Sequence, residues 1–256
     1  MKRDPRLPES HKEGADINQR SGEHLLELIN DVLDLSKIEA HRMELRETEV
    51  RLKQTLGGIV DLFTIRAEQK GLRFKFEPSE ELPVGIRAEE QKIRQVLINL
   101  LGNAVKFTSA GEIRLVVTTL ETKETGMTVL RFCVEDTGIG IESTELETIF
   151  QPFSQIEQKD HTSEGTGLGL SISHEFVRMM GSELKVESTR GEGTAFWFDI
   201  TCPLIEDPDL IETEIRLGAP IGYAGPRKKI LVVDDTADNR RVIVHTLKPL
   251  GFKMYE

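Results

Sequence analysis

Three features are scarce or absent in this sequence of 256 residues: long apolar runs, paired cysteines and an excess of basic residues. No run approaches the ~18 apolar residues that span a bilayer, and no signal peptide opens the chain. We therefore expect a soluble, cytoplasmic chain without a membrane segment; any anchor of a longer parent protein would lie upstream. The formal net charge of −11 argues against nucleic acid as a partner, because that requires a basic face.

The two cysteines, Cys133 and Cys202, lie far apart and match no paired metal-ligand spacing. We expect both cysteines to lie in strands, where they serve as small apolar side chains. The chain therefore fits a reducing compartment. With 38% hydrophobic residues, the chain can build a core. Its length suits one domain of ordinary size with appendages.

The start of the chain predicts a loop and then a helix. Residues 1–8 carry two prolines among charges, whereas the pattern from about Glu9 to Met43 is helical. Apolar residues recur there at steps of three and four at Leu25, Leu28, Val32 and Leu35, and the stripe is widened by Leu26, Ile29, Leu33 and Ile38. A stripe this wide needs a partner. It either packs on the body of the domain or, as we favour, pairs with another helix in a bundle.

The middle of the chain alternates between helix-like and strand-like segments. Helical periodicity covers Gln54–Gln69, Gln91–Phe107 and Ser171–Met180. Strand-like patterns cover Arg73–Phe76, Glu112–Leu120, Val129–Glu135, Glu183–Ser188 and Ala195–Ile200, with a hairpin turn at Glu121–Gly126. This order predicts an α+β fold, a two-layer sandwich with helices on one face of a mixed sheet.

The composition changes after the last of these strands. Pro203 to Arg227 is rich in proline, glycine and acidic residues, which predicts a linker. A new unit follows, with a buried-type strand at Ile230–Val233, the pair Asp234 and Asp235, and a helix at Asp238–Leu247. It is too short to bury a core of its own. The predicted domain boundaries are residues 1–43, 44–203, 204–227 and 228–256.

A carboxylate and two glycines follow the strand that ends at Glu135. Asp136-Thr137-Gly138-Ile139-Gly140 places a hydrogen-bond acceptor beside backbone that a ligand can approach closely. A buried carboxylate there can select an amino group such as that of adenine. Taken alone, the segment is better explained as a simple Asp-Thr-Gly turn.

Glycines also open the helix that starts at Ser171. In Gly165-Thr166-Gly167-Leu168-Gly169 they would expose backbone N–H groups at the positive end of a helix, which suits phosphate. A dinucleotide fingerprint needs glycine where Leu170 stands, and a Walker loop needs Gly-Lys-Ser or Gly-Lys-Thr, which occurs nowhere in the chain. Both of those phosphate-binding motifs are excluded.

Two further segments are weak signals when taken alone. Asn99 and Asn103 lie four apart on one face of a predicted helix, and Lys106 is adjacent. Amide oxygens can ligate Mg²⁺ and a lysine offsets phosphate charge, although an ordinary polar helix face explains these residues at least as well. Gly191-Glu192-Gly193-Thr194, before a strand, predicts a hairpin turn.

In this order the segments form a specific series. Asn99–Lys106, Asp136–Gly140, Phe150–Phe153, Gly165–Gly169 and Gly191–Thr194 together resemble the motif series of the histidine kinase catalytic domain, over about residues 42–202. That domain has the ATP-binding fold shared with gyrase, mismatch-repair and heat-shock chaperone ATPases. The preceding helix, ending in Leu33-Asp34-Leu35-Ser36-Lys37-Ile38-Glu39, resembles the second helix of a dimerisation and histidine-phosphotransfer hairpin.

The resemblance implies ATP and Mg²⁺ as cofactors and assigns a role to each matching residue. Asn103 would ligate Mg²⁺, with Asn99 and Lys106 contacting phosphate. Asp136 would accept a hydrogen bond from the adenine amino group. The other implied nucleotide-binding residues are Gly138 and Gly140, which shape the pocket, Gly165, Gly167 and Gly169, which cradle the phosphates, and Thr166, Leu168 and Thr194.

A mobile lid from about Ser154 to Glu164 is also implied, with Phe150 and Phe153 as its anchors. Lys159 and His161 in this lid are candidates for contact with the γ-phosphate. A solvated lid surface is the better explanation of those two residues.

The sequence departs from the family at two places. The family usually has an aspartate at the position of Glu89, and we expect the pocket to tolerate glutamate there. The phosphoacceptor histidine should lie in the first helix of the hairpin, and Ser10-His11-Lys12 is only a superficial match because no proline follows it. Asp4–Glu9 instead resembles the loop between the two helices. We therefore expect the chain to begin midway through the hairpin, to lack the substrate histidine and to be unable to autophosphorylate.

The C-terminal unit resembles the start of a response-regulator receiver domain. Asp234 and Asp235 match its acidic Mg²⁺-binding pair, hard oxygen ligands at the end of a first parallel strand. The alternative is an unrelated βα unit. In a receiver domain the phosphoacceptor aspartate and the later lysine would lie beyond Glu256.

Together these resemblances imply part of a hybrid sensor histidine kinase that is a homodimer at full length. It would transfer the γ-phosphate of ATP to a histidine, for relay to a receiver domain or response regulator. One alternative is an ATPase of the same fold, in which a catalytic glutamate occupies the place of Asn99. The other is a scaffold that binds nucleotide without kinase activity.

Overall fold

The computed structural model describes residues 22, 25–26, 28–38, 40, 42–123, 125–154, 166–205, 228–233, 240, 244, 247 and 251–255. The chain divides into two compact units, Met1–Leu210 and Ile211–Glu256. Several predicted features lie outside the described residues. They are the Ser10-His11-Lys12 match, most of the lid with Lys159 and His161, Gly165, the linker after residue 205, and Asp234 with Asp235.

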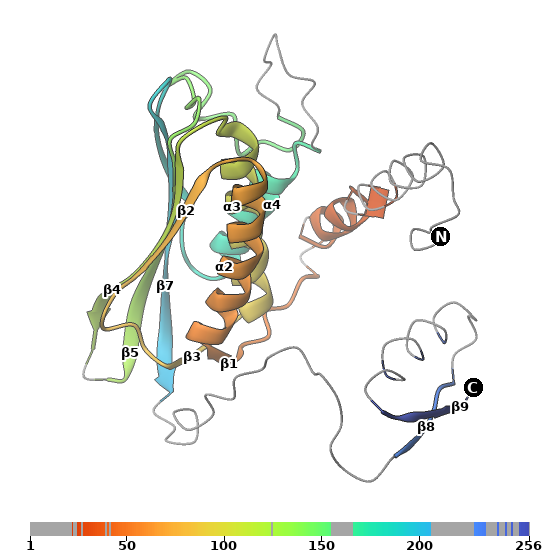
Figure 1. The fold of residues 1–256 in the computed structure, drawn as a ribbon. Coiled ribbons are helices and arrows are strands. Elements are labelled where there is room, and N and C mark those ends of the chain that lie inside the picture. The colour runs from red at the N-terminus through yellow and green to blue at the C-terminus, as the bar shows by residue number, and fades with distance from the viewer. Residues whose placement is uncertain are drawn as a thin grey trace, which may run out of the picture. The chain divides into compact units, whose positions relative to one another are not determined.

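A seven-stranded mixed sheet forms the centre of the first unit (Figure 1). Its strands are β1 (Thr48–Arg51), β2 (Arg73–Pro78), β3 (Gly85–Ala88), β4 (Glu112–Thr122), β5 (Met127–Asp136), β6 (Lys185–Thr189) and β7 (Gly193–Ile205). The strand order is β1-β3-β7-β5-β4-β2, and β6 pairs with the other end of β7. Only β2 and β4 run parallel among the described pairs of this sheet.

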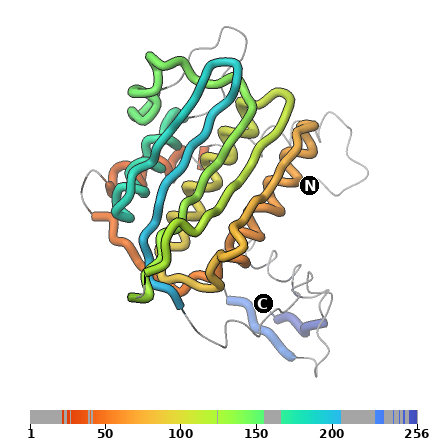
Figure 2. Tube along the Cα trace, turned by 90° about the vertical axis from the view of Figure 1, so that its left-hand side faces the viewer, coloured from red at the N-terminus to blue at the C-terminus, as the bar shows by residue number. Residues whose placement is uncertain are grey.

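Three helices, α2 (Leu52–Gln69), α3 (Glu90–Phe107) and α4 (Gly169–Met179), cover one face of this sheet. Figure 2 shows the strands in front of the helices. Alternate residues of the long strands point into this layer, so that Leu130, Phe132 and Val134 of β5 are buried. The ring of Phe132 stacks on that of Phe198 in β7, with 5.2 Å between centroids. On the other face, Arg131 forms a two-pronged ion pair with Asp199, at 2.7 and 2.8 Å.

The predicted fold class, an α+β sandwich with a mixed sheet and helices on one face, is confirmed. The eight strands and helices predicted between Gln54 and Ile200 all occur, within five residues of their expected bounds. Two short strands, β1 and β3, were not predicted. They pair with each other antiparallel and extend the sheet beyond β7.

The N-terminal helix is described at residues 22, 25–26 and 28–38, residue 40 lies in a turn and residues 42–47 are irregular, so the predicted helical end at Met43 was wrong. Ile38 is buried in the domain core and Leu35 packs against it. The rest of the predicted stripe is exposed at Leu25, Leu26, Ile29, Val32 and Leu33. The last turn of the helix therefore packs on the body of the domain, while a bundle partner for the exposed part stays a prediction.

In the second unit, β8 (Lys229–Leu231) pairs in parallel with β9 (Lys253–Tyr255). Residues 240, 244 and 247 between them are helical. The sequence predicted one strand and one helix, and missed β9. In the part of the chain that the structure describes, no helix is both long and apolar enough to cross a membrane.

Candidate nucleotide-binding site

Asp136 is the last residue of β5, and β7 begins beside it. The two strands pair so that Asp136 lies opposite Thr194. Ser188 of β6 completes this corner through its hydroxyl. The Ser188 Oγ lies 2.9 Å from Thr194 Oγ1 and donates to the Gly193 carbonyl at 2.8 Å. It also accepts from the Ile141 N–H at 2.8 Å. Sheet pairing thus brings together the Asp136 and Thr194 motifs, which are 58 positions apart in the sequence (194 − 136).

The loop after Asp136 lies against backbone on both sides. The Ile139 N–H donates to the Phe107 carbonyl at the end of α3 (3.3 Å), and the Ile139 carbonyl accepts from the Gly191 N–H (2.7 Å). A Cβ at position 138 would lie 2.6 Å from the Phe107 carbonyl oxygen, and one at position 140 would lie 2.1 Å from that of Thr189. Gly140 also has φ of +66°. Only glycine fits at these two positions, as the predicted shaping role requires.

The Asp136 carboxylate is largely shielded from solvent. Burial raises its pKa, and the Gly138 N–H, which donates to Oδ1 at 2.8 Å, opposes that shift. The fully buried Thr108 Oγ1 lies close enough to help lower the pKa of Asp136, but makes no hydrogen bond of ordinary geometry to any described residue. The corner therefore presents one hydrogen-bond acceptor, the Asp136 carboxylate, which is suited to a polar ligand edge, while the Thr108 hydroxyl is buried beside it.

Asn99, Asn103 and Lys106 lie on successive turns of α3. Asn99 ties α3 to α4, because its Nδ2 donates to Ser173 Oγ at 2.8 Å. A Cβ at position 169 would lie only 2.4 Å from the Asn99 Oδ1. The absence of a side chain at Gly169 therefore allows α3 and α4 to approach each other closely. Asn103 is half-buried and its amide makes no hydrogen bond to the described residues, while Lys106 is exposed. Asn103 is thus the amide of this face that is available to a ligand.

The glycine-rich segment enters α4 as predicted. Thr166 Oγ1 accepts from the Leu168 N–H at 3.0 Å and donates to Asp31 of the N-terminal helix at 3.2 Å. Leu168 is fully buried and fixes the start of α4. The first turn of α4 carries no acidic residue and no side-chain cap, so its N–H groups are available to an anion.

The two predicted lid anchors differ. Phe150 packs into the domain, 5.1 Å from the ring of His174 and 6.4 Å from that of Phe196. Phe153 is 66% exposed and has φ of +63°, so its ring does not pack on the described domain, and its role as an anchor of the lid stays a prediction. The backbone at this point is the part that matters, because a Cβ on Gly167 would lie 2.9 Å from the Phe153 carbonyl carbon. The described residues that flank segment 155–165, Phe153 and Ser154 on one side and Gly167 on the other, therefore lie side by side.

Sequence reasoning missed the residues that support the motifs. Ser188, Thr108 and Ser173 contact or face the motif residues, but each is an isolated hydroxyl in an ordinary strand or helix pattern. Glu89 was predicted only as a tolerated replacement, yet it is buried and accepts a hydrogen bond from the Arg46 N–H, which holds the segment that leads into β1. No signal in the sequence pairs these residues with their partners.

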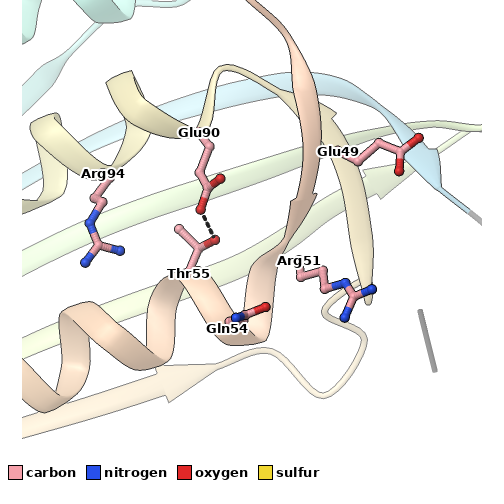
Figure 3. Close-up of a pocket in the computed structure, with 6 residues that line it drawn as sticks. All are labelled: Glu49, Arg51, Gln54, Thr55, Glu90 and Arg94. Atoms are coloured by element: carbon pink, nitrogen blue, oxygen red, sulfur yellow. Dashed lines mark hydrogen bonds between the residues drawn. The ribbon is translucent and has the colours of Figure 1, made fainter. Parts of the chain in front are cut away.

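A separate open pocket lies at the N-terminal ends of α2 and α3 (Figure 3). It is lined by Glu49, Arg51, Gln54, Thr55, Glu90 and Arg94, and Thr55 donates to Glu90 at 2.7 Å. Asn103 is 13 residues beyond Glu90 on α3 (103 − 90), which corresponds to about 20 Å of helix. This pocket contains none of the predicted nucleotide-binding residues.

Comparison with known proteins identifies the fold and its family. A family profile described as histidine kinase-, DNA gyrase B-, and HSP90-like ATPase matches residues 88–204. The chain is 34% identical to the autoinducer 2 sensor kinase/phosphatase LuxQ of Vibrio cholerae over 241 residues, which are 93% of this chain and 28% of that kinase. The chain spans 10% of the length of one curated relative, the hybrid signal transduction histidine kinase B of Dictyostelium discoideum, and 39% of another, the two-component system protein A of Emericella nidulans.

Solved structures agree with the sequence relatives. Full-length ShkA in complex with AMPPNP has a TM-score of 0.66 at 30% identity, covering 98% of this chain and 49% of ShkA. The nucleotide-free catalytic domain of the histidine kinase ThkA has a TM-score of 0.51 at 30% identity, covering 61% of this chain and 98% of that domain. ThkA in complex with the response regulator TrrA has a TM-score of 0.56 at 26% identity, covering 78% of this chain and 54% of ThkA. The chain therefore belongs to the histidine kinases and carries their ATP-binding catalytic domain.

Proposed function

We propose that ATP binds with its adenine at the corner formed by Asp136 and Thr194. The observation that carries this proposal is the confinement of the Asp136 loop between Phe107 and Thr189, which leaves a largely shielded carboxylate bordered by glycine backbone. Asp136 accepts a hydrogen bond from the adenine 6-amino group. The buried Thr108 hydroxyl acts through Asp136, because it helps to lower the pKa of that carboxyl.

The phosphates would extend from this corner along α3 toward the start of α4. The N–H groups of the first turn of α4, with Gly167 and Gly169, offer donors and a positive helix end. Lys106 adds a positive charge on the exposed side. Asn99 acts mainly through position, because its amide already holds Ser173.

The side chains present suit a magnesium ion that is shared with the nucleotide. The described residues contain no group of three or more His, Cys, Asp or Glu side chains able to hold a metal by themselves. Mg²⁺ typically takes one or two protein oxygens together with substrate phosphates and water. The half-buried, unpaired amide of Asn103 supplies such an oxygen, and the bound ion would neutralise charge on the β- and γ-phosphates.

The reaction we propose is phosphoryl transfer to a histidine on a helix of a partner hairpin. An imidazole nitrogen attacks the γ-phosphorus, the bond from that phosphorus to the β–γ bridging oxygen breaks, and ADP leaves. The domain contributes positioning and charge neutralisation, with no covalent step of its own. The phosphohistidine would then pass its phosphoryl group to a receiver aspartate.

The proposed partners follow from the same relatives. Several of them are hybrid kinases by name, and ThkA forms a complex with a response regulator. We propose a receiver domain or response regulator as the downstream partner, and a homodimer joined through the exposed stripe of the N-terminal helix. In a hybrid kinase, Asp234 and Asp235 would be the Mg²⁺-binding pair of the receiver.

The chain is poorly suited to rapid ATP hydrolysis. An ATPase of this fold needs a carboxylate base at position 99 to activate water. Asn99 cannot remove a proton from water, and its amide donates to Ser173 while it packs on Gly169. We therefore favour the kinase over the ATPase alternative.

Transfer in trans tests this function. The full chain would be incubated with γ-labelled ATP, Mg²⁺ and a separate hairpin domain that carries the phosphoacceptor histidine of a relative. We expect acid-labile label on the hairpin, lost with Asp136→Asn and Asn103→Leu and retained with Lys75→Met, a surface variant on β2. ATP binding without any transfer would favour the scaffold, and fast phosphate release that depends on Asn103 would favour the ATPase.

A further inference from the structure

Lys70 is held rigidly at the C-terminal end of α2. This helix ends in a Schellman motif, in which the Leu72 N–H donates to the Ala67 carbonyl (2.9 Å) and the Gly71 N–H to that of Glu68 (3.0 Å). Gly71 has φ of +73°, as this motif requires. The next residue, Arg73, is pinned by its N–H to the Gly111 carbonyl at 3.0 Å. The backbone of Lys70 is thus fixed on both sides.

The Lys70 side chain reaches the carboxyl end of α3. Its Nζ donates to the main-chain carbonyls of Val105 at 2.5 Å and Lys106 at 2.8 Å. A helix leaves its last four carbonyls without partners inside the helix. In α3 the first of these, on Ala104, accepts from the Thr108 N–H, and the last, on Phe107, accepts from the Ile139 N–H. The two carbonyls between these, on Val105 and Lys106, accept from the Lys70 Nζ.

These contacts connect α2 to the adenine loop through the backbone. The Phe107 carbonyl, next to the two that Lys70 holds, accepts from Ile139 and stands where a Cβ on Gly138 would collide. Gly138 in turn donates to Asp136 Oδ1. A shift of the last turn of α3 would therefore move the segment that orients the Asp136 carboxylate.

We propose that Lys70 is a positioning residue for nucleotide binding, which holds the last turn of α3 so that the Asp136 loop keeps its geometry toward adenine. This inference rests on the proposed function, because it assumes that adenine binds at Asp136. Lys70 does not touch the base in this arrangement. Its effect reaches the base through the carbonyls of α3, and so it should already be present for adenosine, which has no phosphate.

The test compares Lys70→Met, Lys70→Arg and the control Lys75→Met in the full chain. Lys75 is also an exposed lysine, on the neighbouring strand β2, where it pairs with Glu112 at 2.9 Å and not with α3. Dissociation constants for adenosine, ADP and ATP with Mg²⁺ would be measured by displacement of a fluorescent ADP analogue. Hydrogen exchange at the Ile139 amide would report the loop directly.

We expect Lys70→Met to weaken adenosine binding by about threefold to tenfold, the usual effect of losing hydrogen bonds to a charged group at a partly exposed site. ADP and ATP should lose at least as much, because Lys106 lies on the same turn of α3. Hydrogen exchange at the Ile139 amide should be faster in Lys70→Met than in the native chain. Lys70→Arg should keep nucleotide affinity and Ile139 exchange close to the native values, and Lys75→Met should change neither quantity. Unchanged affinity in Lys70→Met would overturn the proposal. So would a loss confined to ADP and ATP, because it would show that Lys70 acts on the phosphates and not on the Asp136 loop. Absence of binding by the native chain would instead refute the proposed function.

Discussion

Replacing Gly140 by alanine should damage nucleotide binding far more than it damages the fold. The residue has φ of +66°, which costs an alanine about 1 kcal/mol, and the added Cβ would lie 2.1 Å from the Thr189 carbonyl oxygen. Ordinary contact needs more than about 3.4 Å, so backbone near Asp136 must move by about 1 Å. Misaligning one hydrogen bond to a carboxylate costs about 1.5–3 kcal/mol, or roughly tenfold to a hundredfold in affinity.

The matched control is Gly126→Ala. Gly126 also has a positive φ, +76°, but nothing lies within 4 Å of an added Cβ. It precedes β5 at the end opposite to Asp136, about 30 Å away along the strand. Titration with a fluorescent ATP analogue and thermal denaturation would be measured for both variants. Equal losses of affinity in Gly140→Ala and Gly126→Ala would refute the role of the collision with Thr189, because the positive φ that the two positions share would then explain both losses.

Three further predictions concern titration, thiol reactivity and packing. Burial raises the pKa of Asp136, and its ionised form accepts a hydrogen bond from an amino group more strongly than its protonated form. Nucleotide affinity should therefore fall as the pH drops through a value above 3.8, and Asp136→Asn should lack this step in the same pH titration. Burial raises the pKa of Cys133 to about 12 and that of Cys202 to about 11. In the folded chain at pH 8, both thiols should therefore react with iodoacetamide at least about a hundredfold more slowly than in the chain unfolded by guanidinium. Rapid labelling of the folded chain would contradict the buried environments of the two thiols. Phe150→Ala should destabilise the domain by about 1–3 kcal/mol in urea unfolding, whereas Phe153→Ala should change stability by less than about 0.5 kcal/mol; equal effects would show that the exposed ring of Phe153 is packed in solution.

The long elements of the fold could be predicted because their patterns repeat several times. Helix α3 shows five helical turns of apolar spacing, and β5 alternates over ten residues. The four-residue strands β1 and β3 offer too few positions for any period to be recognised. Their pairing with each other and with β7 depends on contacts between distant segments, which no local pattern encodes.

The site shows the same division between local motif and distant partner. Glycine spacing and the adjacent carboxylate predicted the Asp136 loop, because close backbone approach requires glycine. The backbone that approaches, at Phe107 and Thr189, comes from other elements and became visible only in the fold. Phe153 was predicted from a motif as an anchor, whereas the structure uses its backbone beside Gly167 and leaves its ring exposed. Lys70 had no motif at all.

The most direct test of the central claim is a titration of the full chain with a fluorescent ATP analogue and Mg²⁺, beside Asp136→Asn and Asn103→Leu. The account predicts saturable binding that ATP displaces, weakened at least tenfold by either substitution, which corresponds to about 1.4 kcal/mol. Binding that both variants retain at native strength, or no binding by a native chain shown to be folded, would contradict the placement of ATP between Asp136 and Asn103.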